Sequence, residues 1–221
     1  RPNIILVADA YIDYNGVICT EDFDLNGYKL RTKGKVVSKG TIYGGNDSEL
    51  TADEGIKAGD VVAREGVTLF GGTLKATTMR MDNAQVTCTN DLELYAVSEM
   101  NSEEDVLHVK GDFKVGNRSR NSGSKYYTSA MTAGTVELEG DLAFEASGGY
   151  YPDYGYYPTG TCKTVFCGTE LQTVSGNVSE EENIDLGKVE IRNSKFTMEE
   201  KDSHRPNIIL VADAYIDYNG V

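Results

Sequence analysis

Two neighbouring stretches carry the pattern that is decisive for the fold: Leu25-Asn26-Gly27-Tyr28-Lys29-Leu30 and Lys35-Val36-Val37-Ser38-Lys39-Gly40-Thr41-Ile42. Short runs of alternating apolar and polar residues are separated by glycines that lie next to asparagine or lysine. Alternation with a period of two is typical of a strand with one buried face, and glycine tolerates the backbone angles of a sharp corner. The stretch therefore predicts a strand, a corner, a second strand and a second corner.

The same pattern continues along the rest of the chain. Strands are predicted at Ile4 to Val7, Lys35 to Ser38, Val67 to Phe70, Gln85 to Thr89, Val106 to Val109, Thr135 to Leu138 and Lys188 to Ile191. Helical periodicity is almost absent. Thr51 and Glu54 have the spacing of a capping box, but Gly55 and Gly59 follow at once and favour a turn or a single helical turn. We therefore expect an all-β chain.

Two all-β architectures accommodate many short strands with glycine corners: a β-sandwich and a β-solenoid. We favour the solenoid, a parallel β-helix-like rod in which coils of about 20 residues stack and bury one another's inner faces. A unit of about 200 residues would form roughly nine or ten such coils and extend about 45 Å along the axis. A solenoid also continues naturally into a further copy, because its end strands offer unpaired edges.

The N-terminal segment of the chain, Arg1 to Val17 (RPNIILVADAYIDYNGV), returns unchanged at the C-terminus as Arg205 to Val221. This identity leaves three interpretations: a window from a recently homogenised tandem array, an engineered sequence, or one exchanged strand that is supplied twice. We favour the array. Residues 1–204 are then one repeat unit, and residues 205–221 begin the next identical copy.

In an array, the edge strands of one unit form the junction with the next. The candidate junction residues are the apolar runs at the start of the two copies: Ile4, Ile5, Leu6 and Val7 in the first, and Ile208, Ile209, Leu210 and Val211 in the second. The expected partners are therefore adjoining copies of the same unit, because each open end needs a further coil to cover it.

The composition is strongly acidic, with a formal net charge of −14 at pH 7 and a pI near 4.6. This charge argues against nucleic acid and anionic membrane surfaces as partners, because both would be repelled. The runs Glu180 to Glu182 and Glu199 to Asp202 are expected to be solvated faces, with cation binding as the alternative. No apolar run approaches the ~18 residues of a spanning helix, so we expect a soluble chain without membrane insertion.

A tyrosine-rich segment interrupts the strand pattern between Gly149 and Pro158. Its candidate contact residues are Tyr150, Tyr151, Tyr154, Tyr156 and Tyr157. Tyrosine offers a rigid apolar face with a polar tip, which suits stacking on sugar rings or on a neighbouring fibre. Three interpretations remain open: a loop that folds back over the side of the solenoid, a contact between chains, and a glycan-binding site.

The four cysteines, Cys19, Cys88, Cys162 and Cys167, do not have the spacing of a simple disulfide framework. Cys162 and Cys167 would lie about 16 Å apart on a straight strand, far beyond disulfide reach. Buried free thiols, at least one disulfide, and a bridge between chains all remain open. No second cysteine pair or nearby histidine completes a zinc set, and we expect no cofactor.

Candidate catalytic groups are scarce, and we expect that the protein is not an enzyme. Neither His108 nor His204 lies beside a recognisable nucleophile. One set of charged residues resembles the carboxylates and basic groups of a pectin-cleaving β-helix enzyme: Asp60, Arg64, Arg80 and Asp82. We regard this competing class as the minor interpretation, because an array of near-identical enzymes is an odd way to supply activity.

The run Asp22 to Gly27 imitates the opening of a calcium-binding loop, with acidic or amide side chains at alternate positions before a glycine. The imitation fails at its end, because Lys33 stands where the loop needs a bidentate glutamate. A corner in which Asn26 bonds its own backbone is the better account.

Four further segments carry a resemblance to a known class of proteins. They are Asn101 to Phe113 (NSEEDVLHVKGDF), Met131 to Phe144 (MTAGTVELEGDLAF), Gly160 to Ser175 (GTCKTVFCGTELQTVS) and Asn183 to Ser194 (NIDLGKVEIRNS). In this order, and with the corner at Leu25 to Gly27, they resemble tandem-repeat β-solenoid surface proteins of Gram-positive, Clostridia-like bacteria. The resemblance implies an extracellular or cell-surface-attached protein and carries no catalytic residues. The tyrosine-rich segment and the pair Cys162 and Cys167 depart from the pattern.

Together these features predict a structural extracellular protein that forms a long, stiff, acidic fibre or stalk by end-to-end stacking of solenoid units. Two alternatives remain. One is a carbohydrate-binding adhesin that uses the tyrosine-rich segment, and the other is a fibre assembled by exchange of the terminal strand between chains. Neighbouring fibres or glycans would then be the additional partners.

Overall fold

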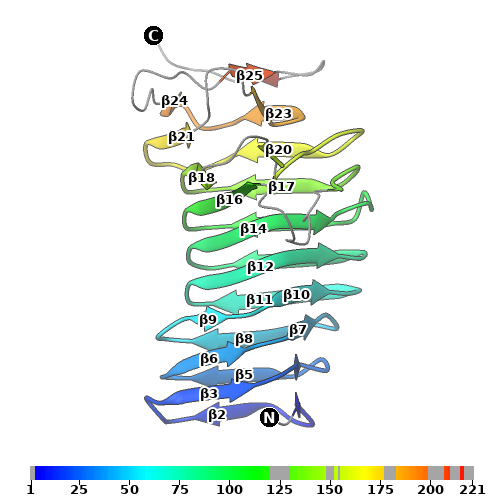
Figure 1. The fold of residues 1–221 in the computed structure, drawn as a ribbon, viewed down its shortest axis with the longest axis vertical. Helices are drawn as coiled ribbons and strands as arrows, with labels where there is room; N and C mark the ends of the chain where they lie inside the picture. Colours follow the sequence, from blue (N-terminus) through cyan, green and yellow to red (C-terminus); the bar gives the residue numbers. More distant parts are fainter. Residues whose placement is uncertain are drawn as a thin grey trace.

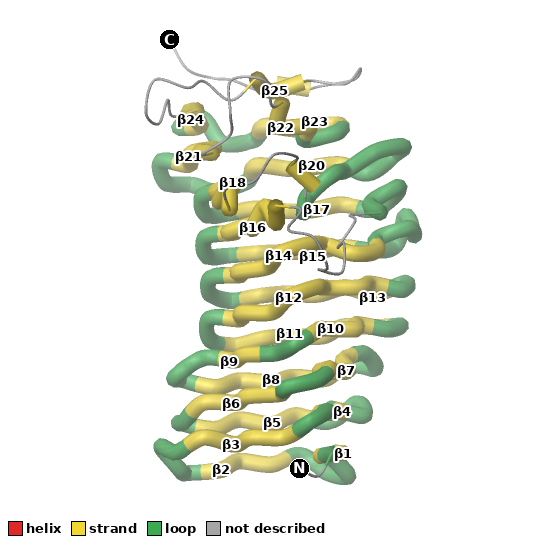
Figure 2. Tube along the Cα trace, in the orientation of Figure 1, coloured by secondary structure: helices red, strands yellow, loops and turns green. Residues whose placement is uncertain are grey.

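Each coil of the chain adds strands to two parallel sheets, which pack across a single apolar core (Figure 1). The computed structural model describes residues 3–119, 130–147, 152–153, 155–176, 183–198, 207–209 and 215–216. All regular secondary structure in this part of the chain is strand, and the coils stack into a rod (Figure 2). The predicted all-β solenoid is confirmed.

One sheet, here called sheet B, has ten strands in sequence order along the rod. They are β2 (Ala10–Ile12), β5 (Lys29–Thr32), β8 (Ser48–Ala52), β11 (Gly66–Gly71), β13 (Ala84–Cys88), β15 (Val106–Val109), β17 (Thr135–Leu138), β20 (Lys163–Phe166), β23 (Lys188–Ile191) and β26 (Tyr215–Ile216). Leu30 pairs with Leu50, and Leu50 pairs with Phe70. A coil in this region therefore has 20 residues, as the sequence predicts.

The other sheet, here called sheet A, has 14 strands. Its main path contains β1 (Ile4–Ile5), β4 (Phe23–Asp24), β7 (Thr41–Gly44), β10 (Asp60–Ala63), β12 (Leu74–Met81), β14 (Leu92–Glu99), β16 (Phe113–Ser119), β18 (Leu142–Ser147), β21 (Gln172–Gly176) and β24 (Phe196–Met198). A shorter row beside it contains β3 (Val17–Thr20), β6 (Lys35–Ser38) and β9 (Ile56–Lys57). The long strand β12 joins the two rows, because it pairs with both β9 and β10.

Two smaller features complete the topology. The strand β19 (Pro152–Asp153) pairs antiparallel with the end of β16. The strands β22 (Asn183–Asp185) and β25 (Asn207–Ile209) form a separate parallel pair near the C-terminal end of the rod. Every other pairing between the strands is parallel, as stacked coils require.

Alternation along each strand builds the core. In β6 the side chains of Val36 and Ser38 are buried, whereas Lys35 and Val37 are partly exposed. The parallel register stacks the buried residues of successive strands into columns that run along the rod. One column in sheet A contains Val36, Ile56, Leu74, Leu92, Phe113 and Leu142, all of them buried. Each coil thus keeps the inner face of its neighbours out of water, which is the main stabilising contribution.

Asn26 and Gly27 form a corner between sheet A and sheet B, with left-handed φ angles of 48° and 78°. The backbone N–H of Asn26 donates to the carboxylate of Asp24 at 2.8 Å. The side-chain amide of Asn26 donates to the carbonyl oxygen of Leu6, in the preceding coil, at 3.0 Å. The prediction that Asn26 bonds its own backbone is therefore wrong for its side chain, because stacking places a carbonyl of the adjacent coil within reach.

Successive corners on the other side of the rod are linked by a ladder of carboxylates. Asp91 accepts a hydrogen bond from the backbone N–H of Asp112 at 3.0 Å. Asp112 accepts one from Asp141 at 3.0 Å, and Asp141 accepts one from Thr173 at 2.7 Å. Hydrogen bonds to an ionised acceptor are stronger than neutral ones. Each corner is therefore held in place by the carboxylate of the coil before it.

Coils lengthen in the second half of the rod without losing register. Val109 pairs with Leu138, and Leu138 pairs with Phe166, so these coils have 29 and 28 residues. The extra residues depart from the ladder after β16 and after β18, while Phe113 still pairs with Leu142. The buried columns therefore continue through coils of different length.

Candidate functional site

The first coil of the rod presents unpaired strand edges. Within the described part of the chain, β1 pairs only with β4, and β2 pairs only with β5 (Figure 2). The side of β1 and β2 that faces away from the rod therefore carries backbone N–H and C=O groups without a strand partner. Such an edge is a template on which a further strand can be added.

The same coil exposes apolar side chains. They are Ile5 (61 % exposed), Val7 (80 %), Tyr11 (61 %), Tyr14 (59 %) and Val17 (57 %). Other apolar residues of this coil, such as Ile4 and Leu6, pack against the core but remain only partly buried. An open sheet edge with exposed apolar side chains beside it is a place where another chain segment can be added.

At the other end of the rod, the second copy of the same segment is already laid on the ladder. In β25, Ile208 pairs in parallel with Ile184, and Ile209 pairs with Asp185. In β26, Tyr215 pairs with Glu190, and Ile216 pairs with Ile191. The C-terminal copy thus adds β26 to sheet B, while β25 pairs with β22 outside the two sheets and lies above β23 in Figure 1.

The structure therefore places the predicted junction residues at both ends of the rod. Ile4, Ile5, Leu6 and Val7 lie in the first coil, and Ile208 and Ile209 lie in β25. Leu210 and Val211 lie outside the described residues. Sequence analysis missed Tyr11, Tyr14 and Val17 as members of the exposed face. Their position inside the duplicated segment was the signal that would have identified them.

The tyrosine-rich segment divides its rings between core and surface. Tyr156 is 1 % exposed, whereas Tyr157 is 41 % exposed. The side chains of Tyr150, Tyr151 and Tyr154 lie outside the described residues. The described parts of this segment lie against sheet A, because β19 pairs with β16 and the N–H of Val97 donates to the carbonyl of Gly155. This arrangement agrees with the interpretation of a loop that folds back.

Tyr156 is a core residue and not a surface contact. Its ring meets Phe113 and Phe144 edge-on, with centroid distances of 5.9 and 6.2 Å. Its hydroxyl lies 2.5 Å from the hydroxyl of Thr164, which in turn donates to the carbonyl of Leu186. Burial raises the pKa of Tyr156 far above its ordinary value. The hydrogen bond explains how a phenol is accommodated in this apolar environment.

The cysteines that reach the core behave as small apolar residues. Cys88, Cys162 and Cys167 carry free thiols, and Cys19 lies on β3 in the first coil. Burial raises the pKa of Cys88 and of Cys162 to about 12. Burial also raises the pKa of Cys167, whose thiol donates to the carbonyl of Leu138 at 3.4 Å. A neutral thiol in apolar surroundings is a poor nucleophile.

The four residues that resemble an enzyme site each engage a different neighbour. Asp60 accepts a hydrogen bond from Thr78 at 2.7 Å. Arg64 lies over the ring of Tyr43, with its guanidinium carbon 5.2 Å from the ring centroid. Two pairs complete the set: Arg80 binds Glu99 at 2.6 Å, and Asp82 accepts a bond from Asn83 at 3.4 Å. Each of these four side chains is thus engaged by a neighbour of its own.

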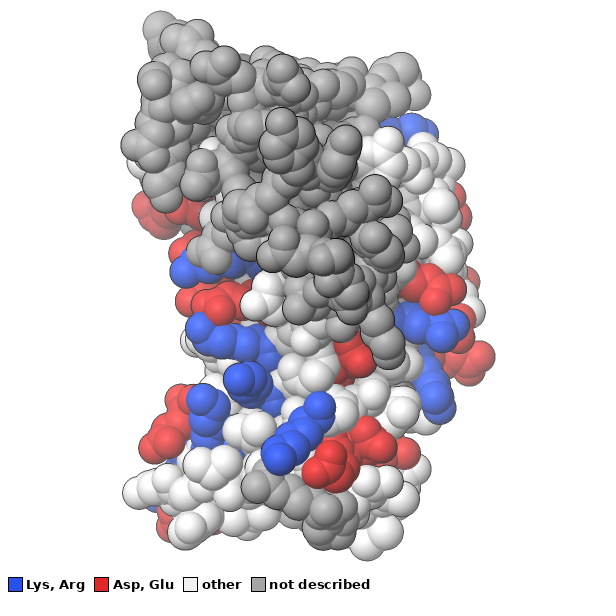
Figure 3. Space-filling model, in the orientation of Figure 1, with Lys and Arg blue, Asp and Glu red and all other residues white. Residues whose placement is uncertain are grey.

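Charged side chains of both signs are interspersed on the described surface that Figure 3 shows. The tightest group is on sheet B, where Glu190 binds Arg192 at 2.6 Å and Lys163 at 2.9 Å. The hydrogen bonds from Arg192 and Lys163 lower the pKa of Glu190, and the same carboxylate raises the pKa of Arg192. His108 contacts Glu139 at 2.7 Å on the same sheet.

Comparisons and searches add no further assignment. The described residues contain no cluster of histidine, cysteine, aspartate or glutamate that could hold a metal ion. Among them there is also no helix long and apolar enough to cross a bilayer. No family model matches the chain, and no curated protein or solved structure is significantly similar to it. The fold and the open strand edges are therefore the features of this chain that bear on its function.

Proposed function

We propose that this protein is a structural repeat protein that forms a long, stiff, acidic fibre or stalk by end-to-end stacking of solenoid units. A single observation carries the proposal. The segment that forms the exposed first coil occurs again in β25 and β26, where β26 adds a parallel strand to sheet B beside β23 and β25 pairs in parallel with β22. The chain thus contains both an open edge and an example of how the same sequence covers such an edge.

The physical chemistry of the junction supports this function. Adding a coil satisfies the backbone groups of β1 and β2 and covers Ile4 and Leu6, which pack against the core but are only partly buried. The two ends of a unit differ, so stacking is head to tail and does not close on itself. The net charge of −14 per chain keeps such rods apart from one another in solution.

We also propose that the fibre is extracellular and attached to the surface of a Gram-positive bacterium. The support is the resemblance of the segments Asn101 to Phe113 and Met131 to Phe144 to repeat-bearing surface proteins. Labelling of intact cells with an antibody against the unit tests this location. Staining that needs prior permeabilisation of the cells would contradict it.

The stacking proposal is tested by comparing the chain of residues 1–221 with a chain in which two units are fused. We expect the fused chain to melt several degrees higher and to self-associate less per unit, because one open edge becomes an internal coil. The matched control is the single unit with Ile5→Asp and Val7→Asp, which should associate less without a change in melting temperature, because both side chains are exposed. Equal melting and equal association of the single and fused chains would contradict the proposal.

Exchange of the terminal strand between separate chains is the alternative assembly, and it uses the same contacts between β22 and β25. The intact mass of the natural polypeptide distinguishes the two. An array requires a covalent chain of many units, whereas exchange requires a chain of one unit.

The other alternative is a glycan-binding site formed by the tyrosine-rich segment. Tyr156 cannot contribute its ring to such a site, because its side chain is buried in the core.

A further inference from the structure

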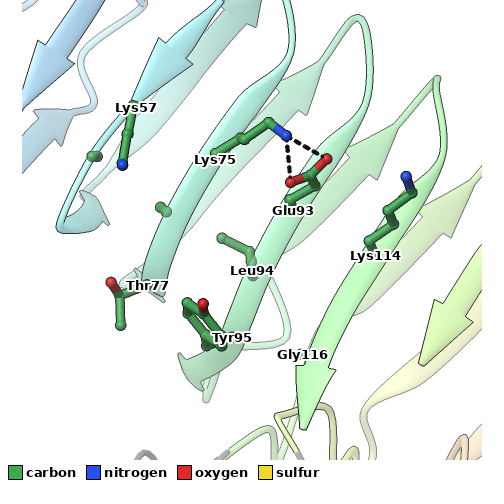
Figure 4. Close-up of a pocket in the computed structure, with 10 residues that line it drawn as sticks. Lys57, Lys75, Thr77, Glu93, Leu94, Tyr95, Lys114 and Gly116 are labelled. Atoms are coloured by element: carbon green, nitrogen blue, oxygen red, sulfur yellow. Dashed lines mark hydrogen bonds and ion pairs between the residues drawn. The ribbon is translucent and has the colours of Figure 1, made fainter. Parts of the chain in front are cut away.

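A groove of about 420 Å³ crosses the outer face of sheet A over β9, β12, β14 and β16 (Figure 4). It lies where the two rows of sheet A merge, on strands that belong to the interior of the rod. Its floor is formed by small and apolar residues such as Ala58, Ala76 and Leu94. The volume falls within the range of sites that bind small ligands.

One side of the groove is a column of charged residues. Parallel register places Lys57 beside Lys75, Lys75 beside Glu93, and Glu93 beside Lys114. The ammonium of Lys75 binds both carboxylate oxygens of Glu93, at 2.8 and 2.7 Å. Lys57 and Lys114 have no carboxylate partner in the described part of the chain. The column therefore ends in two uncompensated positive charges, in a protein whose net charge is −14.

The spacing of these two charges follows from the ladder. Lys57 and Lys114 are three strands apart in the column, and neighbouring strands lie ~4.8 Å apart, so their backbones are separated by about 14 Å. A ligand that satisfies both lysines must therefore carry negative groups at two separated positions. A single small anion would satisfy only one of them.

The other side of the groove offers an aromatic ring. Tyr95 on β14 is 49 % exposed and points into the groove beside Thr77 (Figure 4). A Cβ atom at Gly116, on β16, would lie 2.7 Å from Cδ1 of Tyr95. Glycine at this position therefore gives the ring space to lie over the strand. The ring presents an apolar surface with a hydroxyl at its tip, which suits the C–H face and the hydroxyl groups of a sugar.

The position of the groove disfavours other polyanions. An extended peptide is recognised mainly through the free edge of a sheet, but β14 is already paired with β12 and β16. A nucleic acid would need more than one stacking ring, because successive bases stack on successive aromatic side chains. Recognition here depends on lysine charges and one tyrosine ring, which together match a carbohydrate that carries carboxylates.

We propose that this groove binds a linear acidic oligosaccharide, with carboxylates at Lys57 and Lys114 and a sugar ring stacked on Tyr95. The binding is independent of whether units stack. If they do stack, each unit of the fibre carries one groove, and a long acidic polysaccharide can engage several at once.

The test is calorimetric titration of the 221-residue chain with a linear oligogalacturonate, and with a neutral cello-oligosaccharide of equal length as the control ligand. We expect binding of the acidic sugar only, with an affinity that falls as salt is raised, because the charged contacts are exposed. Lys57→Gln and Lys114→Gln should each weaken binding about tenfold, because each substitution removes one hydrogen bond from a charged ammonium group to the ligand. Lys29→Gln, which removes the same charge from sheet B, should leave binding unchanged.

Two further variants test the ring. Tyr95→Ala should weaken binding about tenfold. Gly116→Ala keeps every charge but displaces the ring, so it should also weaken binding. An unchanged melting temperature checks that each variant is folded. No binding of the acidic sugar, equal effects of Lys29→Gln and Lys57→Gln, or full affinity after Tyr95→Ala would each overturn the proposal. Equal binding of polyglutamate would overturn the assignment to a sugar.

Discussion

The coils that pass through Leu30, Leu50 and Phe70 all have the same length, whereas the coils that pass through Val109, Leu138 and Phe166 are longer and carry additional segments. Both regions nevertheless continue the same two sheets with unbroken parallel register. The difference shows that the two sheets continue because buried residues stack in columns along the rod. A constant coil length is not required. Longer loops add little cost, because the closure entropy of a loop grows only slowly with its length.

The largest expected effect comes from removing a core side chain in each region. Phe113→Ala and Phe23→Ala should each lower the free energy of unfolding by about 3–5 kcal/mol, because both rings are fully buried. Phe113 also loses its contact with Tyr156, so its cost should be at the upper end. Urea denaturation followed by circular dichroism measures both values. A loss below about 1 kcal/mol for Phe113→Ala alone would mean that the longer coils pack loosely.

A smaller effect is expected at the corners. Asp112→Ala removes the acceptor for the N–H of Asp141, and Asp22→Ala removes the acceptor for the N–H of Thr41. Each should cost about 1–2 kcal/mol, because a charge-assisted bond between coils is lost. Asp112→Asn keeps an acceptor oxygen and serves as the control, with a smaller cost. If Asp112→Ala and Asp112→Asn were equally destabilising, the ladder would not be the reason for the aspartate.

The smallest effect is a pH dependence that comes from Glu190 on β23. Arg192 and Lys163 lower the pKa of Glu190 in the folded state. A carboxylate with a lowered folded pKa contributes stability above its unfolded pKa, and this contribution is lost as pH falls through the folded pKa. Glu190→Gln should therefore cost less than about 1 kcal/mol at pH 7 and nothing at pH 2. Thermal melts of both proteins at the two pH values measure this, and an equal difference at both would contradict the pair's role.

Much of the fold was accessible from local patterns. The predicted strands at Lys35 to Ser38, Val106 to Val109, Thr135 to Leu138 and Lys188 to Ile191 coincide with β6, β15, β17 and β23. Alternation predicts which side chains point inward, and glycine marks the corners, so both can be read from a few neighbouring residues. Thr51 to Ala63, expected to hold a turn or one helical turn, contains a turn with Gly55 at a φ of 96° and no helix.

The remaining features depend on how one coil is placed on the next. The column of charged residues along the groove cannot be recognised in the sequence. It exists only because the strand register places Lys57 beside Lys75 and Lys114 beside Glu93. The bond from Asn26 to Leu6 has the same origin. Alternation specifies the face of a residue but not its partner in the adjacent coil, because loops of different length can close the coil at similar cost. The burial of Tyr156 was likewise missed, since its neighbours in sequence resemble a surface loop.

The stacking of coils also has a mechanical consequence. The hydrogen bonds between coils run parallel to the axis of the rod. A force that pulls the two ends apart therefore acts along these bonds, and we expect the outermost coil to detach first. A coil of 20 residues adds ~4.8 Å to the folded rod but reaches up to about 70 Å when drawn out. We expect such a rod to lengthen in small, reversible steps under tension. Stretching single molecules with optical tweezers would reveal these steps, whereas one abrupt rupture would show that the rod yields as a whole.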